Sequence, residues 1–245
     1  LYGSSALNGI INFRTADATN TPVTQFFTEA GIYDKPKNTN WIWWDTPRVF
    51  STTSFSHLQK FGKTDLSIGA NLLIDPGYRK LNDEKVARIN FKLKHFSNKT
   101  EGLNYGVGLN AGYNNKQDFI LWEDAETGAL KQSPSTAREY HGTFLTVDPF
   151  ISLKRPERYQ HDLRMRFQAT TGRLHESEQN NSDAISLYTE YQVWYKLFDF
   201  LDLTAGISEN YSIVISIFFN DHSVLNIAGF TQFEIKPVNR LKAVA

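Results

Sequence analysis

Side chains able to perform metal or hydrolytic chemistry are present in this chain, but their spacing suits neither. The six histidines form no HxH, HxxxH or HExxH pattern, the spacings that bring two imidazoles to one metal ion. Ser54, Ser56 and His57 share one predicted strand, where adjacent residues point to opposite faces, and there is no GxSxG motif. We therefore expect no catalytic residue, no metal and no cofactor, and the chain is not predicted to be an enzyme.

Paired carboxylates also occur, at Glu123 and Asp124 and at Glu176 and Glu178. Such pairs can act as general acid and base when a fold holds them in a cleft. Both pairs lie in predicted loops beside basic residues, however, so solvated loop charges are the simpler interpretation.

An aromatic cluster in the first long loop is the main candidate for ligand contact. Trp41, Trp43 and Trp44 lie within the segment NWIWWD at positions 40–45. The rings either form part of an interfacial girdle or pack within the loop, or else they line a mouth and stack on a ligand. We favour girdle or loop packing. The later long segment contributes three further candidate contacts: Trp122, Arg138 and Tyr140.

Composition excludes several classes of function. The 245 residues carry no formal net charge and no cysteine, and 14% are aromatic. Zero net charge argues against a nucleic-acid partner, which usually meets a basic face. The lack of cysteine excludes disulfides, thiolate metal sites and a cysteine nucleophile. The longest apolar run, SIVISIFF at 212–219, is far shorter than the ~20 residues of a membrane-spanning helix.

Hydrophobic alternation with a period of two residues dominates the chain. In residues 103–114, leucine, tyrosine, valine and alanine alternate strictly with asparagine and glycine, which is typical of a strand with two different faces. The same alternation occurs at 64–75, 85–96, 162–169, 187–196, 201–208 and 225–236, and less cleanly at 24–33, 48–61 and 142–154. Pro149 in the last of these removes a ladder donor and predicts an edge strand or a bulge.

The connections between these strands also differ in length. Short turns are expected near 61–63, 97–102, 155–160 and 198–200, and longer segments at 34–47, 75–84, 118–140 and 177–183. The last two connections, near 220–222 and 238–240, are both short and break this rule. Short turns at one end and long loops at the other, joined by strands of about ten residues, are typical of outer-membrane barrels. The predicted fold is all-β: an antiparallel transmembrane β-barrel segment of about ten to eleven strands, open in this chain.

The first fifteen residues, LYGSSALNGIINFRT, resemble the end of the plug domain of TonB-dependent outer-membrane receptors. Tyr2, Gly3, Asn8, Gly9 and Ile10 carry the resemblance. The segments at 55–73, 75–79 and 87–96 are similar to the first barrel strands of that family. Ser5 departs from the charged residue that the family often carries nearby.

This resemblance implies a domain division, with the end of the plug at 1–15 and the N-terminal part of a barrel at 16–245. It implies that the chain is a piece of a larger receptor with 22 strands. Basic residues of the polar strand faces would then face the lumen, pairing with plug carboxylates or lining a substrate path. These residues are Arg88, Lys92, Lys94, Arg164 and Arg166.

The implied function is ligand-gated, TonB-energised import of a scarce nutrient across the bacterial outer membrane. The expected cargo is an iron–siderophore complex, a corrin or an oligosaccharide. The implied partners are outer-membrane lipid, a TonB-type energy-coupling protein and the cargo itself. Two alternatives stay open: a passive porin, or a barrel hydrolase with a Ser-His-acid set on one face. A plug with a TonB box upstream of Leu1 would decide for import.

Overall fold

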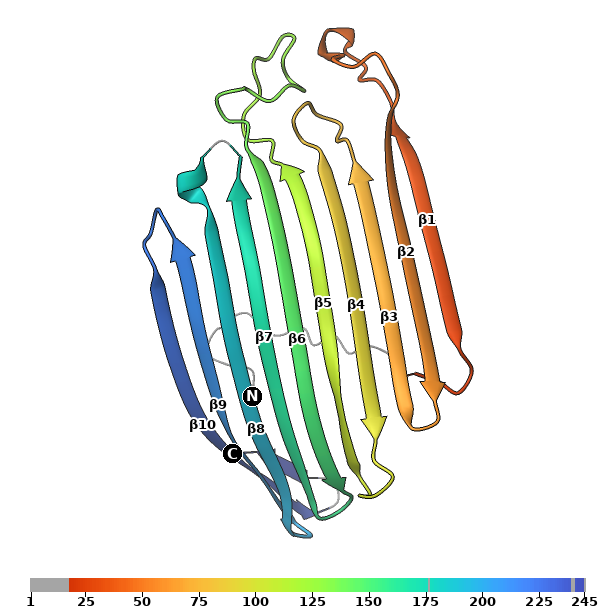
Figure 1. The fold of residues 1–245 in the computed structure, drawn as a ribbon, viewed down its shortest axis with the longest axis vertical. Coiled ribbons are helices and arrows are strands. Elements are labelled where there is room, and N and C mark those ends of the chain that lie inside the picture. Colours follow the sequence, from red (N-terminus) through yellow and green to blue (C-terminus); the bar gives the residue numbers. More distant parts are fainter. Residues whose placement is uncertain (1–17, 176, 239–240, 245) are drawn as a thin grey trace.

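The computed structural model describes residues 18–175, 177–238 and 241–244 and consists of one antiparallel β-sheet (Figure 1). The resemblance motif at Tyr2, Gly3, Asn8, Gly9 and Ile10 lies outside these residues. The strands are β1 (Val23–Tyr33), β2 (Arg48–Phe61), β3 (Thr64–Asp75), β4 (Glu84–Phe96), β5 (Leu103–Gln117), β6 (Glu139–Arg155), β7 (Tyr159–Leu174), β8 (Ser182–Phe198), β9 (Leu201–Ser216), β10 (His222–Val238) and β11 (Leu241–Val244).

Each strand pairs only with its neighbours in sequence, in the order β1 to β11. The sheet does not close on itself, since β1 lies at one end of this order and β11 at the other. This confirms the predicted all-β, antiparallel and open architecture, with ten strands before a short C-terminal one. The described residues contain no α-helix, only two 3-10 turns at Thr39–Trp41 and Glu178–Asn180. No helix in the described part of the chain is long and apolar enough to cross a membrane.

The two ends of the sheet carry different connections (Figure 1). At one end, here called the loop end, the strands are joined by residues 34–47, 76–83, 118–138, the connection that contains the 3-10 turn Glu178–Asn180, and 217–221. At the opposite end, here called the turn end, they are joined by residues 62–63, 97–102, 156–158 and 199–200. The connection at 217–221 is short, as expected, although it lies at the loop end.

Pro149 does not mark an edge strand, because β6 pairs with β5 on one side and with β7 on the other. The register between β6 and β7 is the same on both sides of Pro149, so no bulge is present either. Instead the ladder simply lacks pairs at Asp148 and Pro149, consistent with the missing proline donor. A side-chain contact spans this gap: Arg166 of β7 donates two hydrogen bonds, of 2.8 and 3.0 Å, to the Asp148 carboxylate.

The register places the apolar residues of neighbouring strands in continuous rows. Leu109 lies opposite Phe91 of β4 and Val147 of β6, and the row extends to Ile68 of β3 and Phe167 of β7. Directly opposite residues point to the same face, so these side chains share one side of the sheet, here called the apolar face. Ile89, Ile207, Leu225 and Ile227 also lie on it and are exposed.

Polar and small residues make up the other side, here called the polar face. Asn110 lies opposite Asn90 of β4 and Thr146 of β6. Asp65, Asp162 and Asp202, which also point to this side, are buried, with exposed fractions of 8%, 7% and 7%. Side chains on the concave side of a curved sheet converge and cover one another, so we infer that the polar face is the concave one.

A conventional hydrophobic core is missing from the described part of the chain. Only two of its hydrophobic residues are buried, Trp44 and Val86. Most large apolar side chains are instead exposed, and most of those on the strands lie on the apolar face. Soluble monomers rarely expose contiguous apolar patches larger than a few hundred Å². The apolar face therefore requires a cover that these residues do not supply.

Candidate ligand site at the loop end

The tryptophans of the first long loop pack against the loop that joins β3 to β4. Trp44 is 6% exposed and meets Trp43 and Tyr78 edge to face, at centroid distances of 5.3 and 5.5 Å. The Trp43 indole N–H donates to the Tyr78 carbonyl at 3.3 Å. The Arg48 guanidinium lies 4.3 Å from the centre of the Trp43 ring, a favourable cation–π distance. The two loops are thus joined by an aromatic contact.

The loop at 76–83 has a defined shape because it begins with a tight turn. The Gly77 N–H donates to Asp75 Oδ1 at 2.7 Å, and Gly77 adopts a φ of +73°, which favours glycine. The Tyr33 hydroxyl donates to both Asp75 oxygens, at 3.0 and 2.9 Å. Arg48 Nε donates to the Gly77 carbonyl at 2.8 Å, and its Nη2 donates to the Pro76 carbonyl. Three strand ends therefore hold this turn in place.

The long loop at 118–138 is organised around one buried amide. Gln132 is 1% exposed. Its Oε1 accepts from the N–H groups of Ile120 (2.7 Å) and Leu121 (3.3 Å), and its Nε2 donates to the carbonyls of Asp118 (2.6 Å) and Thr136 (3.2 Å). This one side chain thus forms hydrogen bonds with four backbone groups, which in an irregular loop have no partners from a helix or a sheet.

A second turn in this loop surrounds Asp124. Its Oδ1 accepts from the N–H groups of Thr127 and Glu126, both at 2.7 Å, and from that of Gly128 at 3.0 Å. These backbone hydrogen bonds, that of Thr127 first, lower the pKa of the Asp124 carboxyl from its ordinary value.

The loop at 76–83 also contacts this third loop. The Lys80 N–H donates to the Leu130 carbonyl at 2.9 Å, and the Arg79 guanidinium lies 4.6 Å from the centre of the Phe119 ring. A polar pocket of ≈ 450 Å³ opens beside these contacts, lined by Tyr33, Asp75, Gly77, Tyr78, Arg79, Asn82, Glu84, Lys116, Gln117 and Asp118. Its hydroxyls, amides and charges of both signs could bind a polar ligand.

The predicted contact residues separate into two groups. Trp43 and Trp44 come together in the joined loops, and Trp41 lies in the adjacent 3-10 turn. Trp122 lies in the third loop and is 55% exposed. Arg138 donates to the Ala137 carbonyl at 2.7 Å, within its own loop. Tyr140 lies along β6, its ring against Gly142 and Gly172. Whether any of these residues touches a ligand stays a prediction.

The predicted basic residues all lie on the polar face, as their even positions on β4 and β7 require. Two of them have partners within the sheet: Arg164 lies 3.6 Å from Glu190, and Arg166 pairs with Asp148. Lys94 lies 4.7 Å from the centre of the Phe96 ring. Arg88 is exposed. Lys92 points to the same face. Arg164 and Arg166 thus contact neighbouring strands of the sheet, whereas Phe96 lies on the same strand as Lys94.

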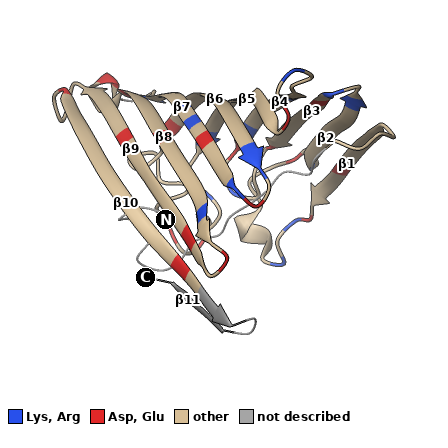
Figure 2. Ribbon diagram, turned by 90° about the horizontal axis from the view of Figure 1, so that it is seen from below, with Lys and Arg blue, Asp and Glu red and all other residues tan. Residues whose placement is uncertain are grey.

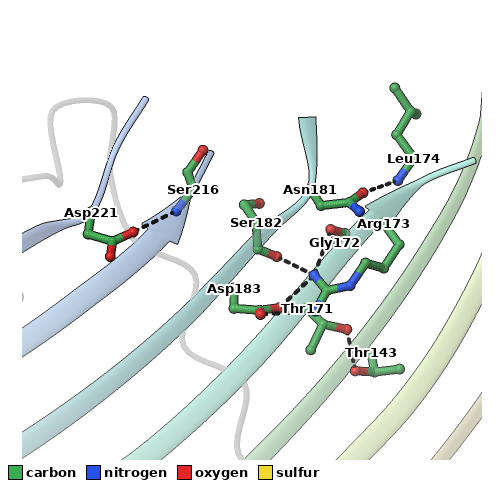
Figure 3. Close-up of polar contacts among 10 residues, drawn as sticks. All are labelled: Thr143, Thr171, Gly172, Arg173, Leu174, Asn181, Ser182, Asp183, Ser216 and Asp221. Atoms are coloured by element: carbon green, nitrogen blue, oxygen red, sulfur yellow. Dashed lines mark hydrogen bonds and ion pairs between the residues drawn. The ribbon is translucent and has the colours of Figure 1, made fainter. Parts of the chain in front are cut away.

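Farther along the loop end, hydrogen bonds close the hairpin between β7 and β8 (Figure 3). Arg173 donates to the carbonyls of Gly172 and Ser182, at 3.0 and 3.1 Å, and forms an ion pair of 2.6 Å with Asp183. The Leu174 N–H donates to Asn181 Oδ1 at 2.8 Å. These contacts fix a short connection.

Several residues that shape this site were not predicted from the sequence. Gln132, Arg48 and Arg79 are isolated polar residues in loops or at strand ends, and no spacing distinguishes them. Asp75 and Gly77 had a usable signal, because Asp-Pro-Gly is a turn sequence. The contacts of Trp43 and Trp44 are with a loop more than thirty residues away in sequence, which local patterns cannot reveal.

In the described part of the chain, no group of three or more His, Cys, Asp or Glu residues could hold a metal ion. No protein-family model matches the chain, and no curated protein matches it.

Proposed function

We propose that this chain forms part of the wall of an outer-membrane transporter of the TonB-dependent class and serves ligand-gated import. The observation that carries the proposal is the separation of the sheet into two unlike faces. The apolar face offers long rows of exposed aliphatic and aromatic side chains, and the polar face offers asparagine, glycine and paired charges. Lipid outside and a hydrated lumen inside would satisfy both.

Aromatic and histidine side chains near both ends of the apolar face support this proposal. Toward the turn end, His161 hydrogen-bonds Tyr191 at 2.6 Å and meets Tyr159 and Tyr195 at ring distances of 5.2 and 5.6 Å. On β5, Tyr105 and Tyr113 bracket the apolar row. They are eight positions apart, which is about 26 Å measured along the strand. That length is comparable with the ~25 Å apolar band of outer-membrane barrels, which aromatic girdles flank.

In this proposal the joined loops at 34–47, 76–83 and 118–138 face outward and meet the cargo. The polar pocket beside Tyr78 is the candidate contact site. Trp122, in the loop at 118–138, is exposed and is a further candidate. Residues 1–15, through their resemblance to a plug end, would link the wall to a plug that a TonB-type protein pulls. The cargo class remains an iron–siderophore complex, a corrin or an oligosaccharide, and no nucleic acid is involved.

An uptake experiment tests the proposal and separates it from a passive porin. Cells that produce or lack the protein are given each of the three cargo classes, with and without an uncoupler of the proton-motive force. We expect uptake of one class to require both the protein and an energised inner membrane. Uptake that persists after uncoupling would identify a porin, and hydrolysis of an offered ester by the purified protein would identify an enzyme.

A further inference from the structure

A second pocket lies at the turn end, on the opposite side of the molecule from the candidate ligand site. Its volume is ≈ 770 Å³, and it is lined by Lys60, Lys63, Phe96, Ser97, Asn98, Lys99, Glu101, Gly102, Leu103, Asn104, Lys154 and Pro156. Lys60, Phe96, Asn104 and Lys154 point to the polar face. Figure 2 views the sheet from this end. The pocket therefore opens toward the concave side and away from the apolar face.

Positive charge is concentrated in this pocket although the chain as a whole is neutral. Four lysines line it, and the only carboxylate in its lining is that of Glu101. Arg155 forms an ion pair of 2.7 Å with Glu101, so this carboxylate is already matched. Lys60 lies 3.8 Å from Asp65. In the described part of the chain, Lys63, Lys99 and Lys154 have no carboxylate within 4.0 Å.

The Phe96 ring, which lines this pocket, lies close to two ammonium groups. Lys60 Nζ lies 5.5 Å from the centre of the Phe96 ring, and Lys94 Nζ lies 4.7 Å from it. Such contacts stabilise a cation without neutralising it. The turns at 62–63 and 97–102 add Lys63 and Lys99 to the same pocket lining. Like charges that line one pocket repel one another, and a bound anion would relieve that repulsion.

We propose that this lysine pocket binds a small, soluble, multivalent oxyanion of the phosphate type. Three unmatched ammonium groups suit several negative oxygens at once, and lysine binds phosphate as a point charge. The volume lies within the 300–1,000 Å³ range usual for small-molecule sites, whereas an acidic peptide would need a longer groove. The opening on the polar face favours a soluble anion over a lipid headgroup. This proposal does not depend on the import function.

Titration calorimetry with inorganic pyrophosphate, on the purified full chain, tests the proposal. The exposed residues allow conservative variants: Lys63→Ala, Lys99→Ala and Lys154→Ala. We expect each single variant to weaken binding about threefold and the Lys63→Ala/Lys99→Ala double variant about tenfold. Raising the salt from about 50 to about 200 mM should also weaken it, because salt screens exposed charges. A Lys35→Ala/Lys37→Ala variant, at the loop end, is the matched control and should bind as the parent does.

Three results would overturn the proposal. The first is the absence of saturable pyrophosphate binding at low salt. The second is an equal loss of affinity in the Lys35→Ala/Lys37→Ala control, which would indicate unspecific charge attraction. The third is saturation only by hexaglutamate, an acidic peptide, or only by short-chain phosphatidylglycerol, a lipid with the same phosphate chemistry. Far-UV circular dichroism of each variant verifies that the sheet is intact.

Discussion

Glycines on the polar face provide space for phenylalanine rings on the neighbouring strand. Gly31, Gly106, Gly112 and Gly206 lie directly opposite Phe50, Phe150, Phe144 and Phe230. A Cβ added at Gly112 would lie 2.3 Å from the Phe144 ring, and one added at Gly206 would lie 2.5 Å from the Phe230 ring. Each ring thus packs over the backbone of the opposite glycine, and this contact replaces the packing that the missing side chain would have provided.

Replacing one of these glycines should therefore destabilise the sheet. We expect Gly112→Ala to lower the free energy of unfolding by about 1–3 kcal/mol, the usual cost of overpacking, because the Phe144 ring must move. Gly108 on the same strand and face is the matched control, since its added Cβ would meet nothing closer than 3.5 Å. Gly108→Ala should be neutral or slightly stabilising. Chemical denaturation measures both. Equal stabilities of the two variants would show that the Phe144 ring is not held over Gly112.

One carboxylate interrupts the apolar face in the middle of a strand. Glu209 of β9 lies opposite Thr189 of β8 and Ile227 of β10, and its side chain is exposed. A carboxylate that faces lipid costs free energy.

Replacement of Glu209 by an apolar residue should stabilise the protein in a bilayer. We expect Glu209→Leu to raise the free energy of unfolding from lipid vesicles by about 1–2 kcal/mol. Glu190→Leu is the contrasting control, because Glu190 lies on the polar face, pairs with Arg164 and accepts from Tyr188 at 2.7 Å. That variant should be destabilised. If Glu209→Leu were destabilised as much as Glu190→Leu, Glu209 would not face lipid.

Among the larger elements, the three joined loops depend on contacts made between them rather than within them. Trp44 is the most buried aromatic residue in this region, and it contacts Trp43 of its own loop and Tyr78 of the next. Removing a buried tryptophan side chain leaves a cavity and typically costs about 3–5 kcal/mol. Here the substitution should destabilise the folded arrangement of the loops rather than the sheet, because Trp44 lies in a loop and not in a strand.

The Trp44→Ala variant should accordingly loosen the loops at 34–47 and 76–83 while the sheet persists. Limited proteolysis and hydrogen exchange of the two loops measure this. Trp122→Ala, at a residue 55% exposed in the third loop, is the control and should leave loop protection unchanged. Protection that survives in Trp44→Ala would mean that the aromatic contact does not join the loops. Loss of cargo uptake in Trp122→Ala at unchanged folding would assign that ring to ligand binding.

The turn around Asp124 should respond to acid. The folded-state pKa of this carboxyl is lowered by backbone hydrogen bonds, so its contribution to turn stability is present above the unfolded pKa of ~3.9 and is lost as the pH falls through the lower folded value. Hydrogen exchange of Thr127 and Gly128 should therefore accelerate below about pH 4 beyond the intrinsic rate. Asp124→Asn retains an acceptor that does not titrate in this range, so this acceleration should be absent. The same acceleration in both proteins would exclude Asp124 as its source.

At the scale of the whole molecule, the alternation of residue types predicted most of the sheet. The strands at 64–75 and 103–114 were clear because one face is apolar and the other is rich in glycine and asparagine, and a one-residue slip would exchange them. The positions of the long loops could be predicted, but their conformations could not. The contacts of Gln132, Trp43 and Arg79 that shape them connect segments with no shared sequence pattern. The lysine pocket arises where separate turns meet, and it was not predicted either.

The proposed membrane wall requires that a charge be tolerated on one face and rejected on the other. Leu109 and Asn110 are adjacent on β5 and point to opposite faces, so they form a matched pair. In lipid vesicles, Leu109→Arg should lower the free energy of unfolding by about 2–4 kcal/mol if Leu109 lies near the bilayer midplane. Asn110→Arg should cost much less, because arginine there would meet water and the other polar side chains of the concave face.

The most direct test of the proposed wall is therefore the equilibrium unfolding of these two variants and the parent from the same vesicles. We predict a large loss of stability for Leu109→Arg and a small one for Asn110→Arg. Equal losses, or a larger loss for Asn110→Arg, would contradict the assignment of the two faces and with it the proposal that this sheet spans a membrane.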